Sequence, residues 1–291
     1  MKSQRELTER QSHASRDGSS RLKKAAKIVE ILSRRVELTG ARVLDIGTGI
    51  GLIAEYLQEI VGPTGRVAAV DRVCQLGCTG DLDFRLVEGA GLPFDDESFD
   101  IVISNHVIEH IGPREEQLKH LAEIRRVLAR NGILYLAAPN RWAPVEPHFR
   151  LPLLSWLPEG MRSAYVRLAG RGKQYDCFPP SRRTLLCMLA ESGLPAAEVT
   201  LEALRITARR ELPGALASAI ARTPDPILRL TMGVIPTFVF IIDKSILDED
   251  SSRRHNAPTP EGRGGISDNT PAAATTVLRL AYGDFSRPPF S

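Results

Sequence analysis

The pattern of apolar and polar positions predicts a chain in which short strands alternate with amphipathic helices. Seven runs are apolar and rich in β-branched or aromatic residues, as buried strands are: 43–46, 67–71, 83–88, 100–105, 133–138, 198–206 and 237–242. Helical spacing of apolar residues marks the stretches 20–37, 52–61, 114–129 and 181–192. This alternation favours an α/β fold built on a mostly parallel sheet.

The two ends of the chain are polar and have no sustained period. Both are rich in Ser and Arg, with too few apolar residues to build a core, so we expect disordered tails at 1–19 and 251–291. The domain itself is expected to span residues 20–250. Its first helix, 20–37, has a basic face that suits either a membrane or nucleic-acid surface, or an ordinary solvated helix packed on the sheet.

A glycine-rich turn follows the first predicted strand. Gly47, Gly49 and Gly51 allow the backbone to turn tightly and to approach a ligand, and helical spacing begins at once at Leu52. The pattern is GxGxG, whereas a dinucleotide site uses GxGxxG. The carboxylate of Asp45 at the mouth of the turn would repel a pyrophosphate but suits a cation, such as the sulfonium of S-adenosylmethionine (SAM).

A second acidic residue, Asp71, ends the second predicted strand about twenty residues further on, where it can accept hydrogen bonds from ribose hydroxyls. Two later segments, GAGLPFDDESFD from Gly89 and NHVIEHI from Asn105, complete a pattern that resembles the class I SAM-dependent methyltransferases of the type 11 kind. The resemblance implies a Rossmann-like, doubly wound, mostly parallel seven-stranded sheet with an antiparallel last strand.

The resemblance also implies a set of cofactor-binding residues. In the family, an acid after the third strand receives the adenine amino group, and Glu88 stands there in place of the usual aspartate. The end of the fourth strand lies beside the sulfonium. The expected cofactor residues are therefore Asp45, Gly47, Thr48, Gly49, Asp71, Arg72, Glu88, Gly89, Ala90, Asn105 and His106.

A long proline-rich and aromatic segment separates the fifth strand from the helix at 181–192. At about residues 140–180 it would lie over the strand ends, so we expect a substrate lid. His148, between prolines, is the first candidate for a general base, and His106 is the second. The apolar residues 151–157 are expected to pack within the lid rather than to form a lipid groove.

The predicted activity is methyl transfer from SAM to a small-molecule acceptor, with O-methylation of a saccharide, lipid-linked glycan or secondary metabolite as the first hypothesis. C-methylation of a quinone or isoprenoid-like ring is the alternative enzyme. A catalytically inactive SAM-binding module is the alternative outside enzymes. The glycine turn lacks the GxGxxG spacing of a dinucleotide site, which disfavours a dehydrogenase. The sequence from Asn105 to Ile108 lacks the proline-aromatic motif of nucleic-acid methyltransferases, which disfavours that class.

The composition of the chain mainly argues against certain kinds of partner, site and segment. The 291 residues carry a net charge of +3, too little to indicate nucleic acid, and the four cysteines contain no CxxC pair, so neither a metal site nor a disulfide scaffold is expected. No apolar run is long enough to span a bilayer, and the polar N-terminus does not resemble a secretory signal. We therefore expect a cytoplasmic protein for which peripheral membrane contact stays open, and the sequence leaves the oligomeric state undetermined.

Overall fold

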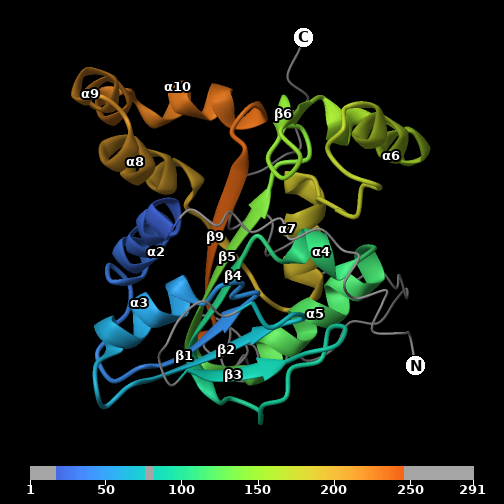
Figure 1. Ribbon diagram of the computed structural model, residues 1–291. Coiled ribbons are helices and arrows are strands. Elements are labelled where there is room, and N and C mark those ends of the chain that lie inside the picture. Colours follow the sequence, from blue (N-terminus) through green and yellow to red (C-terminus); the bar gives the residue numbers. More distant parts are fainter. Residues whose placement is uncertain (1–17, 76–81, 246–291) are drawn as a thin grey trace, which may run out of the picture.

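The computed structural model describes residues 18–75 and 82–245, and its centre is a seven-stranded sheet (Figure 1). The strands follow the order β3-β2-β1-β4-β5-β9-β8. Their bounds are β1 Arg42–Ile46, β2 Arg66–Asp71, β3 Asp83–Leu86, β4 Phe99–Asn105, β5 Leu128–Pro139, β8 Ala197–Glu198 and β9 Thr237–Asp243. The first five are parallel and β9 runs antiparallel between β5 and β8, which confirms the predicted doubly wound sheet.

Helices cover both faces of this sheet, so its strands are apolar on both sides. One layer contains α2 (Gly18–Leu32), α3 (Leu52–Val61) and α8 (Thr200–Glu211), which pack on one cluster of buried residues. The other contains α4 (Ile108–Ile111), α5 (Arg114–Val127) and α7 (Arg182–Glu191), which pack on a second cluster. Strand order reverses between β1 and β4, and ligands of such sheets bind at the carboxyl ends of the strands at that point.

The predicted strand at 198–206 is wrong. Only Ala197 and Glu198 pair with β9, and the chain turns into α8 at Thr200. The buried residues of α8 include Ala203 and Ile206, which are three positions apart and share one helical face. The alternation of apolar residues at the start of this stretch was misleading, because good helix formers follow it as far as Glu211.

Two segments project beyond the carboxyl ends of the parallel strands (Figure 1). The first, residues 140–180, contains β6 (Val145–Glu146), β7 (Leu151–Pro152), the 3-10 turn η1 (Leu154–Trp156) and α6 (Glu159–Leu168). It has a small core of its own, formed by Phe149, Leu151, Leu154, Val166 and Cys177. The second follows α8 and consists of α9 (Gly214–Arg222), α10 (Asp225–Arg229) and the 3-10 turn η2 (Leu230–Gly233).

The ends of the domain agree only in part with the predicted tails. Helix α2 begins at Gly18, two residues inside the predicted N-terminal tail, while the predicted C-terminal tail lies outside the described residues. Residues 76–81, between β2 and β3, also lie outside the described residues. Within the described ranges, no helix has both the length and the apolar character that a membrane span requires.

Candidate cofactor and acceptor site

The glycine turn between β1 and α3 has a backbone that only glycine adopts readily. Gly47, Gly49 and Gly51 have φ angles of 72°, 60° and 86°, in the left-handed region. A methyl group on Gly47 would also lie 2.5 Å from Cγ2 of Val107, the residue that begins the turn after β4. The close packing of these two loops therefore requires glycine at position 47, as the motif predicted.

Asp71 holds the glycine turn against the end of β2. Its carboxylate accepts a hydrogen bond from the amide of Gly49 at 2.7 Å and another from the amide of Arg72 at 2.6 Å. The turn is tied to β2 again through Val70, whose carbonyl accepts the amide of Gly47. Asp71 thus has a structural role in the turn besides the ribose contact that its position predicts.

Asp45 is a buried carboxylate at the bottom of the site. Its side chain is 2% exposed, and among the described residues its Oδ2 atom has no hydrogen-bond partner. Burial raises the pKa of Asp45 to about 7. An orphaned acidic oxygen next to the glycine turn fits a ligand with a positive charge, and SAM carries both a sulfonium and an ammonium group.

A cavity of about 960 Å³ lies over this end of the sheet, within the size range of small-molecule sites. Nine of the predicted cofactor residues line it: Asp45, Gly47, Gly49, Asp71, Arg72, Gly89, Ala90, Asn105 and His106. Thr48 and Glu88 do not. Thr48 is buried behind the turn, and the Glu88 side chain is exposed, although its neighbours Val87 and Gly89 face the cavity. The adenine contact of Glu88 therefore stays a prediction.

Helix α2 forms a wall of the cavity, although none of its residues was among the predicted cofactor residues. Arg21 and Lys24 line the cavity from this helix, and Arg21 Nη1 donates a hydrogen bond of 3.4 Å to the carbonyl of Thr48. Burial lowers the pKa of both side chains. The apolar face of α2 packs on the sheet, so the ordinary interpretation of helix 20–37 is correct for that face, while part of its basic face points at the site.

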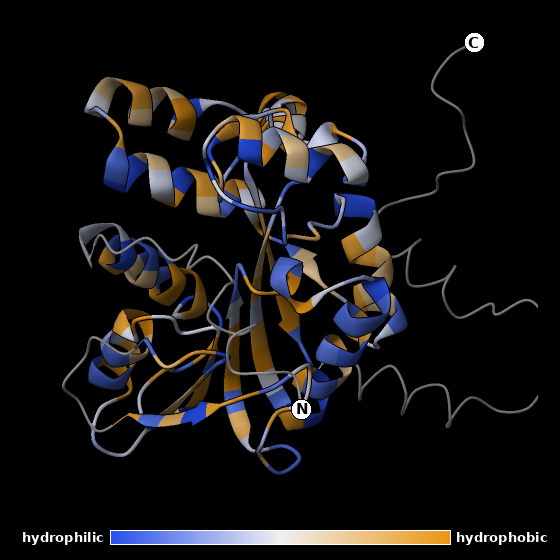
Figure 2. Cartoon of the chain, turned by 45° about the vertical axis from the view of Figure 1, so that its right-hand side comes forward, coloured by the Kyte–Doolittle hydropathy of each residue, from blue (hydrophilic) through white to orange (hydrophobic). Residues whose placement is uncertain are grey.

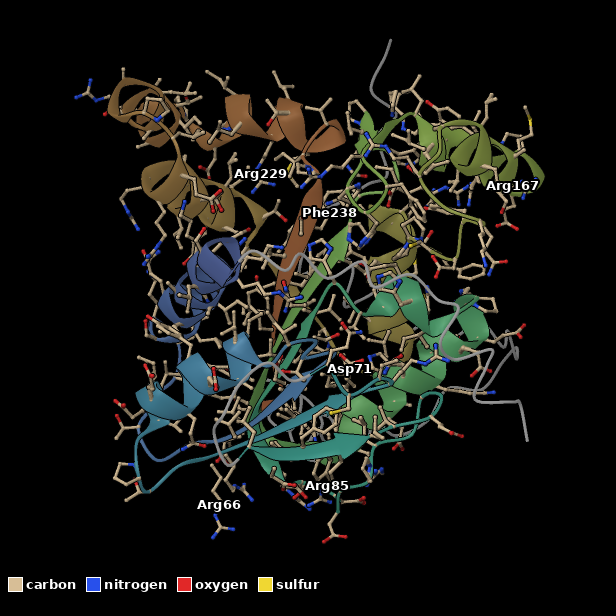
Figure 3. The ribbon with its side chains drawn as sticks, viewed as in Figure 1. Arg66, Asp71, Arg85, Arg167, Arg229 and Phe238 are labelled. Carbon is tan, nitrogen blue, oxygen red and sulfur yellow. The ribbon has the colours of Figure 1, made fainter. Side chains whose placement is uncertain are left out.

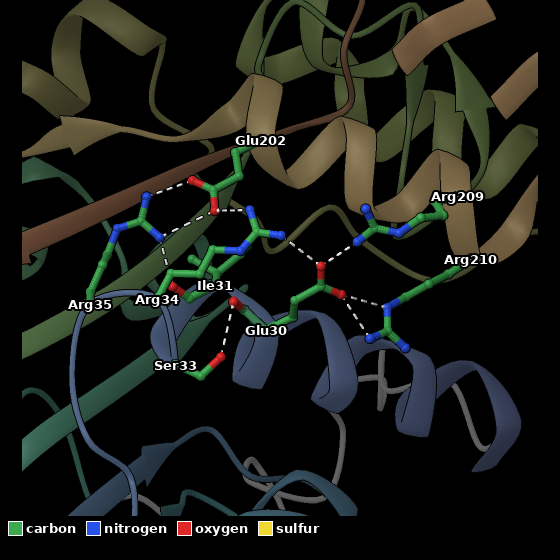
Figure 4. Close-up of polar contacts among 8 residues, drawn as sticks. All are labelled: Glu30, Ile31, Ser33, Arg34, Arg35, Glu202, Arg209 and Arg210. Atoms are coloured by element: carbon green, nitrogen blue, oxygen red, sulfur yellow. Dashed lines mark hydrogen bonds and ion pairs between the residues drawn. The ribbon is translucent and has the colours of Figure 1, made fainter. Parts of the chain in front are cut away.

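Ion pairs connect α2 and the turn that follows it to α8 (Figure 4). Glu30 on α2 accepts hydrogen bonds from Arg34 in that turn and from Arg209 and Arg210 on α8. Glu202 on α8 pairs in the opposite direction with Arg34 and Arg35. Two acids and four arginines therefore help to hold α2, which lines the cavity, against α8.

Three histidines surround a buried glutamate on the other side of the cavity. Glu109 is fully buried, and its Oε1 atom lies 3.3 Å from Nδ1 of His106, 3.1 Å from Nε2 of His148 and 4.0 Å from Nε2 of His110. Although burial opposes its charge, the hydrogen bonds from His106 and His148 hold the pKa of Glu109 well below its usual value. The sequence pattern identified His106 and His148 but gave Glu109 no role.

The two candidate bases differ in their environment. His148 is shielded from solvent, which opposes protonation, but its hydrogen bond to Glu109 prevails and raises its pKa. Burial lowers the pKa of His106, whose Nε2 atom lies 3.2 Å from the Thr237 hydroxyl and whose backbone is held at a φ of 59°. Both rings line the cavity, and His148 comes from the 140–180 segment.

The same cluster contains two sets of metal-type donors. The ligand atoms of His106, Glu109 and His148 lie within 4.8 Å of one another, as do those of His110, His148 and Cys177. The hydrogen bonds between Glu109 and its histidines account for the first set without an ion. The sequence-based expectation of no metal site therefore stays a prediction.

Comparisons with known proteins match part of this chain. Residues 44–136 match a family model described as a methyltransferase domain. A relative from Pseudomonas savastanoi pv. phaseolicola, named ubiquinone/menaquinone biosynthesis C-methyltransferase UbiE, is 26% identical over 171 residues, which are 53% of this chain. The match spans 65% of that relative's length, less than two thirds.

Solved structures resemble the fold at lower identity. A SAM-dependent methyltransferase from Aquifex aeolicus has a TM-score of 0.41 and 16% identity, with 78% of this chain and 97% of that chain covered. A structure of SAM-dependent methyltransferases from Methanosarcina mazei has a TM-score of 0.45 and 17% identity, with 74% of this chain and 96% of that chain covered.

Proposed function

We propose that this chain is a class I SAM-dependent methyltransferase and that its small-molecule acceptor loses a proton to His148. The methyltransferase family model over residues 44–136 and the relatives reported above support the class. The observation that carries this proposal is the pair of His148 and Glu109 at the cavity wall. Their Nε2 and Oε1 atoms are 3.1 Å apart, and Glu109 is fully buried. A carboxylate in this position orients the ring and stabilises the imidazolium that forms when the ring takes up a proton.

We assign the cofactor to the side of the cavity formed by the glycine turn and α2. Asp45 would face the positive charges of SAM, Asp71 the ribose, and the backbone at Gly89 and Ala90 the adenine. Arg21 and Lys24 stand where they can attract the carboxylate of the cofactor. Bound SAM supplies a methyl group that is already activated, because its leaving group is a neutral thioether.

The chain's own residues then have three tasks. The glycine turn and the loop after β4 fix the reacting centre, and positioning of this kind can supply roughly 7–11 kcal/mol. The 140–180 segment covers the cavity with Pro147, His148 and Phe149, which excludes water. His148 takes the acceptor proton on the ring nitrogen that does not face Glu109, and Glu109 stabilises the imidazolium that results.

The acceptor we favour is a hydroxylated ring that is methylated on carbon. The name of the relatives, ubiquinone/menaquinone biosynthesis C-methyltransferase, supports this choice. Loss of a ring hydroxyl proton to His148 would make the neighbouring ring carbon nucleophilic, so His148 would act as the base in C-methylation as well. O-methylation of a saccharide, lipid-linked glycan or secondary metabolite is the second candidate, supported by the mixed polar lining of the cavity from Arg150, Arg171 and Asp176.

Titration calorimetry with SAM, S-adenosylhomocysteine and NAD tests the cofactor half of the proposal. We expect binding of the first two and none of NAD. A reaction with a demethylated quinol, followed by mass spectrometry, then tests the acceptor. A methyl group located on a ring carbon supports the first candidate, whereas a methyl group found only on a hydroxyl of a saccharide or phenol supports the second. Cofactor binding without turnover of any acceptor would indicate an inactive SAM-binding module.

A further inference from the structure

Large apolar side chains are exposed mainly in the two projecting segments. Among the described residues, sixteen such side chains are well exposed. Seven lie between residues 142 and 178: Trp142, Val145, Leu153, Trp156, Met161, Leu168 and Phe178. Five lie between 212 and 234: Leu212, Leu216, Ile227, Leu230 and Val234. Only four lie elsewhere, although the two segments make up a small part of the chain.

These apolar side chains lie on the surface and are not part of a buried core. Leu168 is 88% exposed and Leu230 is 83% exposed, while α9 has no buried residue at all. In the 140–180 segment, Leu151 and Leu154 fill the small core, whereas Leu153 and Trp156 beside them face outward. The 140–180 segment thus has an inner face that forms its core and, among the described residues, an outer face with exposed apolar side chains.

Both outer faces lie at one end of the molecule. Figures 1 and 2 place α9, α10, β6 and α6 together beyond the carboxyl ends of the parallel strands, and apolar colour runs along these helices in Figure 2. Trp142 and Trp156 are both about half exposed and their ring centroids are 6.1 Å apart. Paired exposed tryptophans are typical of a membrane–water interface, where one part of the ring is apolar and the other is hydrated.

The charge of the same segments is positive. Residues 140–180 contain six Arg or Lys and three Asp or Glu, and residues 212–236 contain two and one, so the net charges of the segments are +3 and +1. The complete chain has a net charge of +3, so the rest of it has a net charge of −1. In Figure 3, Arg167 and Arg229 lie at this end of the molecule, while Arg66 and Arg85 lie at the opposite end.

We propose that the 140–180 and 212–236 segments together dock this protein on the surface of an anionic lipid bilayer. Exposed tryptophan, leucine and methionine can enter the headgroup region, and the surrounding arginines match the negative surface potential of such a membrane. For helix 20–37, a membrane contact was one of two interpretations of the sequence. Most apolar residues of that helix are buried on the sheet and Leu22 is exposed, so we place the membrane contact on the projecting segments instead.

Docking in this orientation would place the acceptor side of the cavity next to the lipid. The 140–180 segment supplies both the outward Trp156 and the cavity residues His148 and Phe149. An acceptor with a hydrophobic tail could therefore reach His148 without crossing water. This consequence rests on the proposed function, whereas the docking itself does not.

Flotation of the full chain with vesicles tests the docking directly. We expect at least about tenfold more protein to float with phosphatidylcholine vesicles that contain about one third phosphatidylglycerol than with pure phosphatidylcholine. The double variant Leu230→Ser/Val234→Ser and the double variant Trp142→Ser/Trp156→Ser should each reduce the floating fraction several-fold. Arg229→Glu should reduce it as well and should make binding less sensitive to salt.

Matched controls use exposed residues outside the docking surface. The variant Ile60→Ser/Leu86→Ser removes two exposed apolar side chains, and Arg66→Glu reverses a charge at the opposite end. Both should float like the original chain. SAM titration of each variant checks that the domain is folded. Since flotation involves no chemistry, docking can fail while SAM binding and methyl transfer persist, so the two proposals are tested separately.

Three results would overturn the docking proposal. The first is equal flotation with neutral and anionic vesicles. The second is an equal loss in the control and surface variants. The third is a dimer in light scattering that Leu230→Ser/Val234→Ser dissociates, because a second copy of the chain would then cover the apolar surface.

Discussion

The cofactor side and the acceptor side of the cavity are built in different ways. The centre of the cofactor side is the stretch of consecutive residues from Asp45 to Gly51, and the geometry of this glycine turn is a property of the backbone. The acceptor side brings together His106, Glu109 and His148, which are up to 42 residues apart, through side chains alone. A local backbone motif tolerates few residue types, so a sequence displays it, whereas a side-chain cluster can be assembled from many sequences.

The variant His148→Asn should have the largest effect, and it should act on the acceptor side alone. Loss of a general base typically lowers kcat by about 10²–10⁴-fold, while the SAM dissociation constant should change little because His148 lies across the cavity from the glycine turn. Initial rates and calorimetry measure the two separately. A parallel loss of SAM affinity would mean that the two sides are not independent.

Glu109→Gln tests how His148 is held. The carboxylate raises the pKa of His148, and the basic form exists above that pKa, so activity should rise with pH through a midpoint above the ordinary histidine value of about 6.5. Without the charge, the midpoint should move to lower pH and the maximum rate should fall about tenfold. An unchanged pH profile in the variant would exclude the pair as the base.

Gly47→Ala should have the next largest effect, on the cofactor side. The new methyl group would lie 2.5 Å from Val107 at a φ of 72°, and overpacking together with left-handed strain costs roughly 2–4 kcal/mol. We expect weaker SAM binding and a lower free energy of unfolding, measured by titration and by urea. Gly160→Ala is the matched control, since a methyl group there meets open space. Equal effects at both positions would contradict the packing argument.

The same contrast explains what sequence reasoning could predict. The helix at 52–61 and the glycine turn were predicted correctly because a local motif specifies them. The strand at 198–206 was predicted wrongly, because the apolar alternation at its start does not reveal how far the chain pairs with a neighbouring strand. In the structure, the pairing with β9 ends at Glu198 and α8 begins at Thr200. Glu109 was missed for a related reason. Its burial arises from the 140–180 segment, whose Phe178 amide bonds to the Glu109 carbonyl at 2.7 Å, a contact that no local pattern reveals.

Asp45 offers a smaller test on the cofactor side through pH. Its pKa is raised to about 7, so the carboxyl is largely protonated below that pH and ionised above it. A cationic ligand favours the ionised form, so SAM binding should strengthen as pH rises from about 6 to 8, by up to about tenfold through proton linkage. Titrations in buffers with different ionisation enthalpies should reveal the released proton. In Asp45→Asn the dependence should vanish, and its persistence would assign the proton to another group.

The smallest effect is expected at the ion pairs that hold α2 over the cofactor. Glu30→Gln would weaken the contacts to Arg209 and Arg210, which are partly exposed, and such pairs contribute about 0–1 kcal/mol each. Because α2 also carries Arg21 and Lys24 into the cavity, SAM affinity should fall by less than about threefold, and added salt should produce much of the same loss in the original chain. Glu116→Gln, which removes an exposed pair with Lys119 on α5, is the control and should leave affinity unchanged. If Glu30→Gln weakens SAM binding as strongly as Gly47→Ala, the cofactor side also depends on distant side chains, and the contrast between the two sides of the cavity becomes one of degree.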